Sequence, residues 1–546
     1  MDRSNNVFAP VLLALLLTLL AMSAAIFAWS AAGNYLPELN VETPALAKQE
    51  PLLAKAPARA SQRVILVIVD GLRLQESFGL KTLDRLRRAG IDAIATSHYP
   101  TISYPNHVSL VTGVPPLISG VRNNTKRFPV VLDSIMDRVR AGGMTASYVA
   151  DDSPSLGYMF GSDFEALYYG GWPGALAKSA HFALEQGNSS LLVIVPGTVD
   201  VAGHNHGGKS PEYRQAVLDV DAQLAEALQL VNLKDDTVII TADHGHTDGG
   251  GHGGEEEEVL QVPLIMAGAG IRAEGLLGEA ELVDIAPTIA ALLGVPAPGH
   301  SVGRTLTEVL SLAPGEADAL AKSDALRINR NAAIFQDSLD ASKVQVGGAK
   351  RNRLYVFIAF VLVAIGLVWV AGRGGALHID WRVLIMALPA YPLCYYGLLE
   401  VLGQSLSFST LSDRGSEMSH LFRYGLVATL VQLLAGWLAL RGRVILRDRL
   451  AAANALVACG LLFAWIPAGL LWVYHGPPPH LTIPGSRVAL LIPANYVAVA
   501  TYALGAGLLL LLEFIVFFAR AVDPRVRLRR LKVRAALRRI GPNKLE

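Results

Sequence analysis

The sequence is nearly free of cysteine and carries little net charge. It has 2 cysteines in 546 residues, and both, Cys394 and Cys459, lie within apolar segments. The polar part of the chain therefore has no thiol for a disulfide or a cysteine metal site, so a metal bound there needs Asp and His ligands. The formal net charge of +1 provides no global attraction for nucleic acid. We expect no nucleic-acid polymer as a partner.

Charged residues are also scarce, at 17% of the chain against 52% for hydrophobic residues. This balance indicates that part of the chain lies in lipid. The uncharged run 7–32 is long enough to cross a bilayer and follows Arg3. We expect an uncleaved signal anchor, with a cleaved signal peptide as the alternative. In either case the next domain is exported.

Further apolar segments follow in the second half of the chain, at 354–370, 383–402, 424–440, 451–473 and 496–518. Arginines gather in the first and third loops between these segments, and the tail 520–539 is strongly basic. The positive-inside rule then places both termini in the cytoplasm, and we expect a bacterial inner membrane. Glu513 lies within the last segment, where an acid is either functional or snorkels to the interface.

These features divide the chain into six parts. We expect a signal anchor at 1–33, a linker at 34–60 and an exported domain at 61–313. A second linker of low pattern at 314–350, a five-helix transmembrane domain at 351–519 and a basic cytoplasmic tail at 520–546 follow.

Strand-like and helix-like segments alternate in the exported domain. The strand candidates are 64–70, 91–97, 144–150, 191–197, 237–243 and 262–270. Amphipathic helices between them predict an α/β fold with a doubly wound, mostly parallel sheet that is covered on both faces. Ligands bind at the carboxyl ends of strands in such folds. Asp70, Ser103, Asp200 and Asp243 all follow strand candidates, so we expect them to converge.

The stretch 241–258, TADHGHTDGGGHGGEEEE, follows directly on one of these strands. Carboxylate and imidazole groups are natural zinc ligands, and glycines allow the sharp turns that bring His252 back toward Asp243 and His244. The alternative is a glycine-rich surface turn with unengaged histidines.

Two sets of metal ligands follow from these positions. The first set is Asp200, His204 and His252, and the second is Asp70, Asp243 and His244 with the hydroxyl of Ser103. Two divalent ions, expected to be Zn²⁺, would activate the hydroxyl as a nucleophile and clamp a phosphoryl group. Alone, Ser103 would be an ordinary helix cap. Two interpretations stay open for His107, His206 and His246. Each is either a neighbour that orients a metal ligand or a side chain in solvent.

The region 63–309 resembles the alkaline phosphatase superfamily, and within it the type I phosphodiesterase and nucleotide pyrophosphatase family. The front half carries VIVDGLR and PTISYPNHVSLVTGVPPLISGVRNN, in which Ser103 falls at the nucleophile position and Asn124 at the phosphate-binding asparagine. The back half, ADHGHTDGGGHGGEEEEVLQVPLIMAGAGI, is more similar to the ethanolamine phosphate transferases of GPI anchor assembly. The resemblance implies the same metal ligands. The pyrophosphatase relatives commonly have threonine where Ser103 stands.

The sequence thus predicts a membrane-anchored two-metal phosphodiesterase or phospho-head-group transferase with a phospho-serine intermediate on Ser103. A neutral Asn124 suits a phosphodiester better than a monoester. The five extra spans favour a membrane lipid or a lipid-linked glycan as substrate. One alternative is a nucleotide pyrophosphatase that acts on soluble substrates. Another is a transport protein in which the metal domain is structural.

Overall fold

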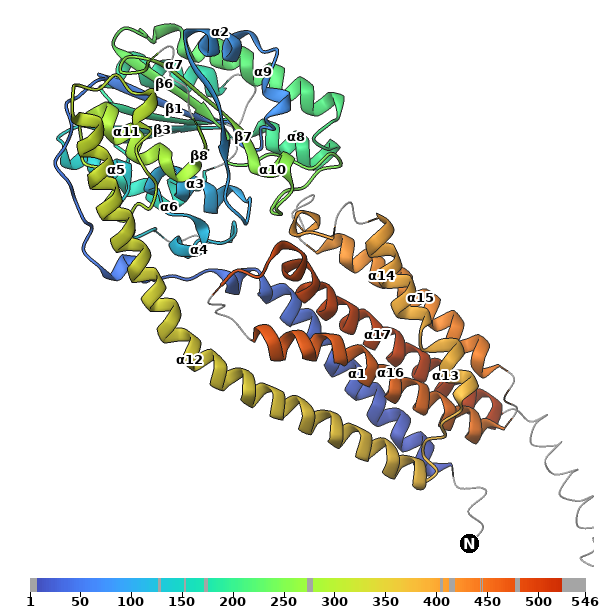
Figure 1. Cartoon of the computed structure of the whole chain (residues 1–546). Helices are drawn as coiled ribbons and strands as arrows, with labels where there is room; N and C mark the ends of the chain where they lie inside the picture. Colours follow the sequence, from blue (N-terminus) through green and yellow to red (C-terminus); the bar gives the residue numbers. More distant parts are fainter. Residues whose placement is uncertain are drawn as a thin grey trace, which may run out of the picture.

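The computed structural model describes residues 7–125, 129–151, 154–170, 175–272, 278–402, 406–411, 418–441, 443, 445–476 and 482–522. An α/β domain, residues 61–313, stands at one end of a bundle of long helices (Figure 1). From residue 523 on, the predicted basic tail lies outside the described residues.

Eight strands in the described residues form one sheet in the order β4-β3-β5-β1-β6-β7-β2-β8. All neighbours pair in parallel except β7, which runs antiparallel to β6 and β2. The central strands are uninterrupted runs of Val, Ile and Leu because both of their faces are buried. The bounds are β1 Arg63–Ile68, β2 Gly90–Thr96, β3 Ala146–Ala150, β4 Ala166–Tyr169, β5 Leu191–Val195, β6 Asp236–Thr241, β7 Gln261–Gly268 and β8 Ala280–Glu281.

Two layers of helices cover this sheet. The first layer contains α2 Lys81–Ala89, α7 Ala175–Gln186 and α9 Pro211–Ala227, and the second contains α3 Ser103–Thr112, α5 Ile135–Ala141 and α11 Ile285–Leu293 (Figure 1). The predicted doubly wound, mostly parallel fold is confirmed. The sequence analysis did not find the short edge strands β4 and β8. The shorter helices are α4 Pro116–Ser119, α6 Ser155–Phe160, α8 Thr198–His206 and α10 Glu257–Leu260.

Six helical segments in the described residues are long and apolar enough to cross a membrane, which confirms the predicted multi-pass membrane protein. They are α1 Phe8–Tyr35, α12 Glu316–Arg373, the pair α13 Trp381–Ala387 and α14 Ala390–Leu402, α15 Ser419–Leu440, α16 Leu446–His475 and α17 Ser486–Val522. The predicted anchor α1 packs along α17 through a face of small residues that includes Ala14, Ala21 and Ala28, which lets the helices approach closely. It is therefore part of the core of the bundle.

Helix α12 changes one expectation from the sequence. The segment 314–350, predicted as a linker of low pattern, is helical from Glu316 and continues without a break into the first membrane span. Its buried positions against the α/β domain are polar, namely Asp324, Arg327 and Asn331, which explains why it shows no apolar stripe. Its lack of proline and its many good helix formers favour the helix. Asn331 donates its amide to the carbonyl oxygens of Gly299 and Ser301 and so ties α12 to the α/β domain.

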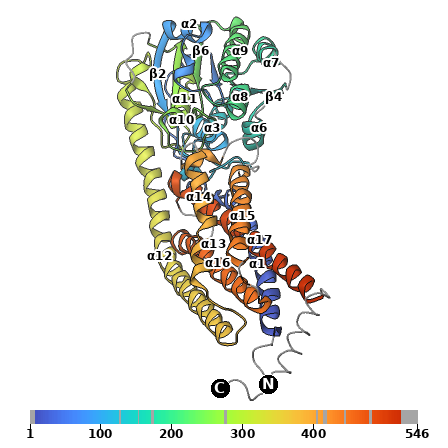
Figure 2. The same cartoon turned by 90° about the vertical axis from the view of Figure 1, so that its right-hand side faces the viewer.

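Glu513 does not snorkel. Its side chain is 4% exposed and forms a bidentate ion pair with Arg449 of α16, with Arg449 Nη2 at 2.7 Å from Glu513 Oε1. A buried charge is tolerated only where a partner neutralises it. The pair therefore joins α16 and α17 at the end of the bundle that is remote from the α/β domain (Figure 2).

Removal of the Glu513 carboxylate is expected to destabilise the bundle. Glu513→Ala leaves the Arg449 guanidinium buried without its partner, a change that costs roughly 3–5 kcal/mol. Unfolding of the full-length protein in detergent measures this loss. The control is Glu400→Ala, which removes an exposed carboxylate from α14. Equal stability of the two variants would show that the ion pair does not hold the bundle.

Candidate metal centre

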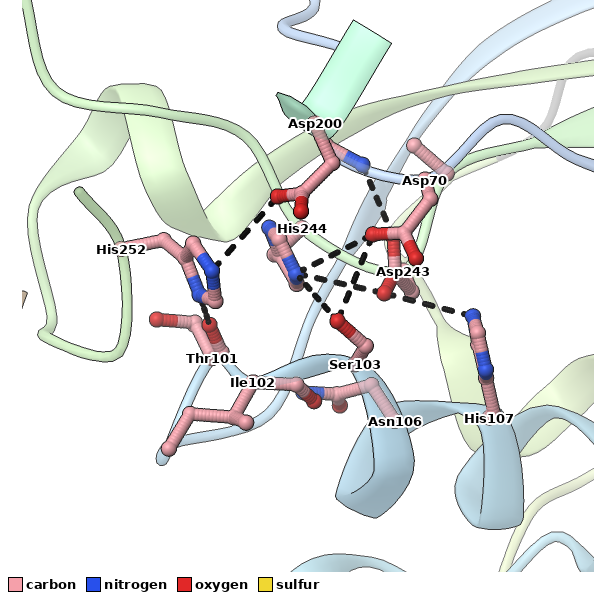
Figure 3. Close-up of polar contacts among 12 residues, drawn as sticks. Asp70, Thr101, Ile102, Ser103, Asn106, His107, Asp200, Asp243, His244 and His252 are labelled. Carbon is pink, nitrogen blue, oxygen red and sulfur yellow. Dashed lines mark hydrogen bonds and ion pairs between the residues drawn. The ribbon is translucent and has the colours of Figure 1, made fainter. Parts of the chain in front are cut away.

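The predicted site residues meet where strands end. Asp70 follows β1, Asp243 and His244 follow β6, and Asp200 lies in the first turn of α8, just after β5. Ser103 is the first residue of α3 and points toward these groups (Figure 3). Parallel strands place their carboxyl ends at one edge of the sheet, which is why residues far apart in sequence converge here.

The first cluster surrounds the Asp200 carboxylate. Its ligand atoms lie within 4.8 Å of one another and come from Asp200, His204, His246 and His252. His204 Nε2 is 3.4 Å from Asp200 Oδ2, and His246 Nε2 is 3.3 Å from Asp200 Oδ1. His252 Nε2 lies 3.6 Å from the same Oδ1 atom. The structure therefore brings together the three predicted residues and adds His246.

The second cluster surrounds Ser103. Its hydroxyl oxygen lies 3.4 Å from Asp70 Oδ1 and 3.3 Å from His244 Nε2. His244 Nε2 is in turn 3.3 Å from Asp243 Oδ2, and His107 Nε2 reaches the same carboxylate atom at 3.3 Å (Figure 3). Carboxylate oxygens of Asp70 and Asp200 lie within 4.8 Å of each other, so the two clusters adjoin.

Backbone carbonyls orient the imidazole rings. His252 Nδ1 donates to the carbonyl oxygen of Thr101 at 2.8 Å, and His244 Nδ1 donates to that of Gly245 at 3.0 Å. A carbonyl only accepts, so these Nδ1 atoms carry the protons. Each Nε2 atom is then left with its lone pair directed into the cluster, which is the arrangement of metal-ligating histidines.

The buried polar atoms of the site fit a divalent cation. Asp200 Oδ1, Asp243 Oδ2 and His246 Nε2 are buried and have no hydrogen-bond partner among the described residues. Burial lowers the pKa of His246 to about 3 and also lowers that of His252, which keeps both rings neutral as ligands. Burial, followed by the charges of Asp243 and Asp200, raises the pKa of Asp70 well above its usual range. A cation would reverse this effect because it favours the ionised carboxylate.

Asn124 lies beside the nucleophile candidate. Its Oδ1 atom accepts a hydrogen bond of 2.9 Å from the backbone amide of Tyr104, the residue after Ser103. Helix α3 begins at Ser103. The hydroxyl of Ser103 therefore sits at the helix N-terminus itself, a position that favours an anion.

Sequence reasoning left two histidines of the site unassigned. His246 is separated from His244 by one glycine, and its Nδ1 atom faces the Gly71 carbonyl at 3.3 Å. His107 lies one turn after Ser103 on α3, and its Nδ1 atom bonds to Ser155 Oγ. The spacing from Ser103 could have indicated His107, because residues four apart share a helix face. His206 lies exposed at the end of α8, outside the clusters.

The loop 242–258, which carries His252, docks on the helix bundle. Ser409 of the loop between α14 and α15 accepts from the Gly254 amide at 2.9 Å and donates to the Glu256 carboxylate at 2.9 Å. The Phe408 ring, which is 2% exposed, packs with Ile102. A Cβ added at Gly253 would lie 3.2 Å from Cδ1 of the Phe408 ring. The bundle therefore supports both the loop 242–258 and the segment before Ser103.

Truncation of Phe408 is expected to weaken metal binding. Phe408→Ala removes the support behind His252, and the loss of such support typically reduces metal affinity about 10–100-fold. Chelator competition on the full-length protein measures the dissociation constant, and Phe408→Leu, which keeps an apolar contact, is the control. A Phe408→Ala protein that melts earlier but holds its metal as tightly would show that this contact only stabilises the fold.

Two family models match the segments that carry the site. The model described as type I phosphodiesterase/nucleotide pyrophosphatase matches residues 64–141, which include Asp70, Ser103 and Asn124. The model described as Metalloenzyme superfamily matches residues 174–297, which include Asp200 and the loop 242–258.

Curated relatives match over the same part of the chain. The catalytic subunit of GPI ethanolamine phosphate transferase 2 of Homo sapiens is 24% identical over 277 residues, which is 46% of this chain and 28% of that protein. GPI ethanolamine phosphate transferase 1 of Homo sapiens is 26% identical over 301 residues, with 44% of this chain and 32% of that protein covered. The chain thus spans about a third or less of the length of these relatives.

Among solved structures, murine ectonucleotide pyrophosphatase/phosphodiesterase 5 is 16% identical, with 43% of this chain and 96% of that chain covered and a TM-score of 0.37, a likeness too low to support an argument. The predicted resemblance is confirmed by the family models and the curated relatives. The site-bearing region matches the Metalloenzyme superfamily and the type I phosphodiesterase/nucleotide pyrophosphatase family, and its homologues are the GPI ethanolamine phosphate transferases.

Proposed function

We propose that the chain is a metal-dependent phosphodiesterase or phospho-head-group transferase of the membrane, with Ser103 as its nucleophile. The position of the Ser103 hydroxyl carries this proposal. Its oxygen lies 3.3 Å from His244 Nε2 and 3.4 Å from Asp70 Oδ1, at the N-terminus of α3. A purely structural metal site would be closed by its ligands and would have no use for a poised hydroxyl.

The donor sets support two ions, and we assign both as Zn²⁺. Asp200, His204 and His252 would hold the first ion, with His246 as a further ligand or a neighbour of the ligands. Asp70, Asp243 and His244 would hold the second ion together with the Ser103 oxygen. When bound, such ions stabilise the alkoxide of a serine and offset the charge of phosphoryl oxygens. Oxygen and imidazole donors suit zinc.

The reaction proceeds in two displacements. Ser103 Oγ forms a bond to the phosphorus of a diester while the bond from phosphorus to the leaving alcohol breaks, and that alcohol takes up the proton of the serine. The side-chain amide of Asn124, whose Oδ1 atom accepts from Tyr104, would donate from its Nδ2 group to a phosphoryl oxygen. A hydroxyl of the acceptor, or water, then attacks phosphorus and returns its proton to Ser103 as the phospho-serine bond breaks.

We infer that the substrate is a membrane lipid or a lipid-linked glycan. The relatives named above are ethanolamine phosphate transferases, which suggests phosphoethanolamine as the transferred group. The docking of the loop 242–258 on the bundle supports the inference, because it sets the candidate nucleophile close to the membrane spans. The match to the nucleotide pyrophosphatase model keeps soluble diesters as the second candidate class.

We place the α/β domain on the exported side, with both termini cytoplasmic. The start of α1 and the end of α17 both lie at the end of the bundle that is remote from this domain (Figure 2). The arginines of the loops 373–382 and 441–449 lie at that end as well, in line with the positive-inside rule.

Replacement of the nucleophile separates the proposed chemistry from a structural role. Ser103→Ala is expected to lower kcat by at least a factor of about 1,000, because no hydroxyl remains to form the covalent bond. The metal content should be retained, because the substitution removes only one exchangeable ligand. Ser103→Thr keeps the hydroxyl and is the matched control. The measurement is turnover of phosphatidylethanolamine vesicles and of a soluble diester, and near-normal activity of Ser103→Ala would refute the assignment.

The histidines of the first cluster give a second test. His246→Ala is expected to reduce the zinc bound to the purified protein, and His204→Ala should do so as well, because each removes an imidazole that faces Asp200. His206→Ala, an exposed neighbour, is the control and should keep the wild-type content. Elemental analysis measures the metal per chain. Full zinc content in both cluster variants would contradict the ligand assignment.

A further inference from the structure

A pocket lies between α1 and α15, at the end of the bundle that faces the α/β domain. It has a volume of about 400 Å³. Trp29, Gly33 and Leu36 line it from α1 and its C-terminus, and Phe422 and Arg423 line it from α15. Helix α1 packs along α16 and α17 rather than along α15, so space remains between the two helices.

The walls of the pocket combine apolar and cationic groups. The Trp29 and Phe422 rings meet edge to face, with 5.1 Å between their centroids. Trp29 is 43% exposed, so the pocket is open toward the surroundings of the bundle. Arg423 donates to Ser419 Oγ at 3.2 Å, and among the described residues no carboxylate lies within ion-pair distance of it. Its guanidinium thus remains available to an anionic oxygen.

The location of these groups favours one class of occupant. Trp and Arg at the end of a membrane helix lie at the depth of lipid head groups, where aromatic rings meet acyl chains and guanidinium groups meet phosphates. A volume of about 400 Å³ accommodates a phospholipid head group with its adjoining methylenes. A lipid-linked glycan is much larger. A glycerophospholipid therefore fits the pocket best.

Leu36 connects the pocket to the segments beside the candidate nucleophile. The carbonyl oxygen of Leu36 accepts a hydrogen bond from the Asn123 amide, and Asn123 directly precedes Asn124. Leu36 also belongs to the same buried apolar cluster as Ile102, the residue before Ser103. A lipid held here would lie next to the segments that position both Asn124 and Ser103.

We propose that this pocket is the entry site for a glycerophospholipid substrate, whose phosphate binds Arg423 and Ser419 while its chains pack against Trp29 and Phe422. The lipid moves from this position to Ser103. The inference rests on the proposed function, because it assigns the donor of the transferred head group to one class of lipid.

Two variants test the pocket without altering the metal centre. A Cβ at Gly33 would meet only Met418 Cε, at 3.9 Å, so Gly33→Leu fills the pocket without a backbone clash. Gly366→Leu is its matched control, because Gly366 lies on the membrane span of α12 with nothing within 4 Å of an added Cβ. Arg423→Gln removes the charge and keeps much of the side-chain volume, and Arg423→Lys restores the charge.

The experiment uses the full-length protein in vesicles of phosphatidylethanolamine and phosphatidylcholine. Gly33→Leu and Arg423→Gln are expected to raise KM for phosphatidylethanolamine about tenfold, the effect of one lost charge-assisted contact. Turnover of bis(p-nitrophenyl) phosphate should stay at the wild-type rate. The phospholipid retained after purification in detergent, quantified by mass spectrometry, should fall in both variants but not in Gly366→Leu or Arg423→Lys.

Wild-type KM and wild-type lipid retention in both variants would overturn the proposal. Reduced retention with an unchanged KM would also overturn the entry role, because the pocket would then hold a structural lipid. If the wild-type protein turned over no diester at all, the proposed function would fail, and lipid retention alone would decide whether the pocket binds phospholipid.

Discussion

The mutual approach of three carboxylates, the buried Asp70 and Asp243 and the partly exposed Asp200, is the constraint on which the site depends. Burial and the neighbouring negative charges raise the pKa of Asp70, whereas nearby histidines, acting against burial, lower the pKa values of Asp200 and Asp243. Three carboxylates this close together stay ionised only beside positive charge. Neutral imidazoles cannot supply that charge, whereas divalent cations can. The parallel strands β1, β5 and β6 impose this approach, because their carboxyl ends meet at one edge of the sheet. The fold thus creates a site that a divalent cation would stabilise.

The helix bundle takes part in this arrangement. The loop with His252 lies between the segment of Thr101 on one side and Phe408 and Ser409 of the bundle on the other. The Thr101 hydroxyl accepts from the Gly253 amide at 2.9 Å and donates to the Gly254 carbonyl at 2.8 Å. One short segment therefore orients His252, precedes Ser103 and contacts the helix bundle. This coupling keeps the α/β domain against its own bundle.

Much of the architecture follows from local pattern. The six predicted strands and the apolar segments are present because long runs of Val, Ile and Leu have few alternatives to burial. Asp70, Asp200 and Asp243 converge because each stands a few residues after the end of such a strand. The remainder depended on tertiary contacts. The edge strand β4 alternates in burial over only four residues, and the buried face of the first part of α12 is polar, so that no apolar stripe reveals the helix.

Within the site, His246 could not be assigned because its role depends on the path of the glycine-rich loop. The carbonyl of Gly71, far away in sequence, faces its ring. The ion pair between Glu513 and Arg449 could not be predicted either. Arg449 lies among loop arginines that the positive-inside rule already explains, so nothing in the sequence singles it out as the partner. Sequence patterns identify the groups that carry chemistry more readily than the contacts that orient them.

The most direct test of the central claim is the capture of the covalent intermediate. The full-length protein is acid-quenched during turnover of phosphatidylethanolamine vesicles, digested, and analysed by mass spectrometry. The account predicts a phosphoethanolamine adduct on the peptide that contains Ser103, and its absence in the Ser103→Ala protein. Turnover without any adduct, or an adduct on another residue, would contradict it.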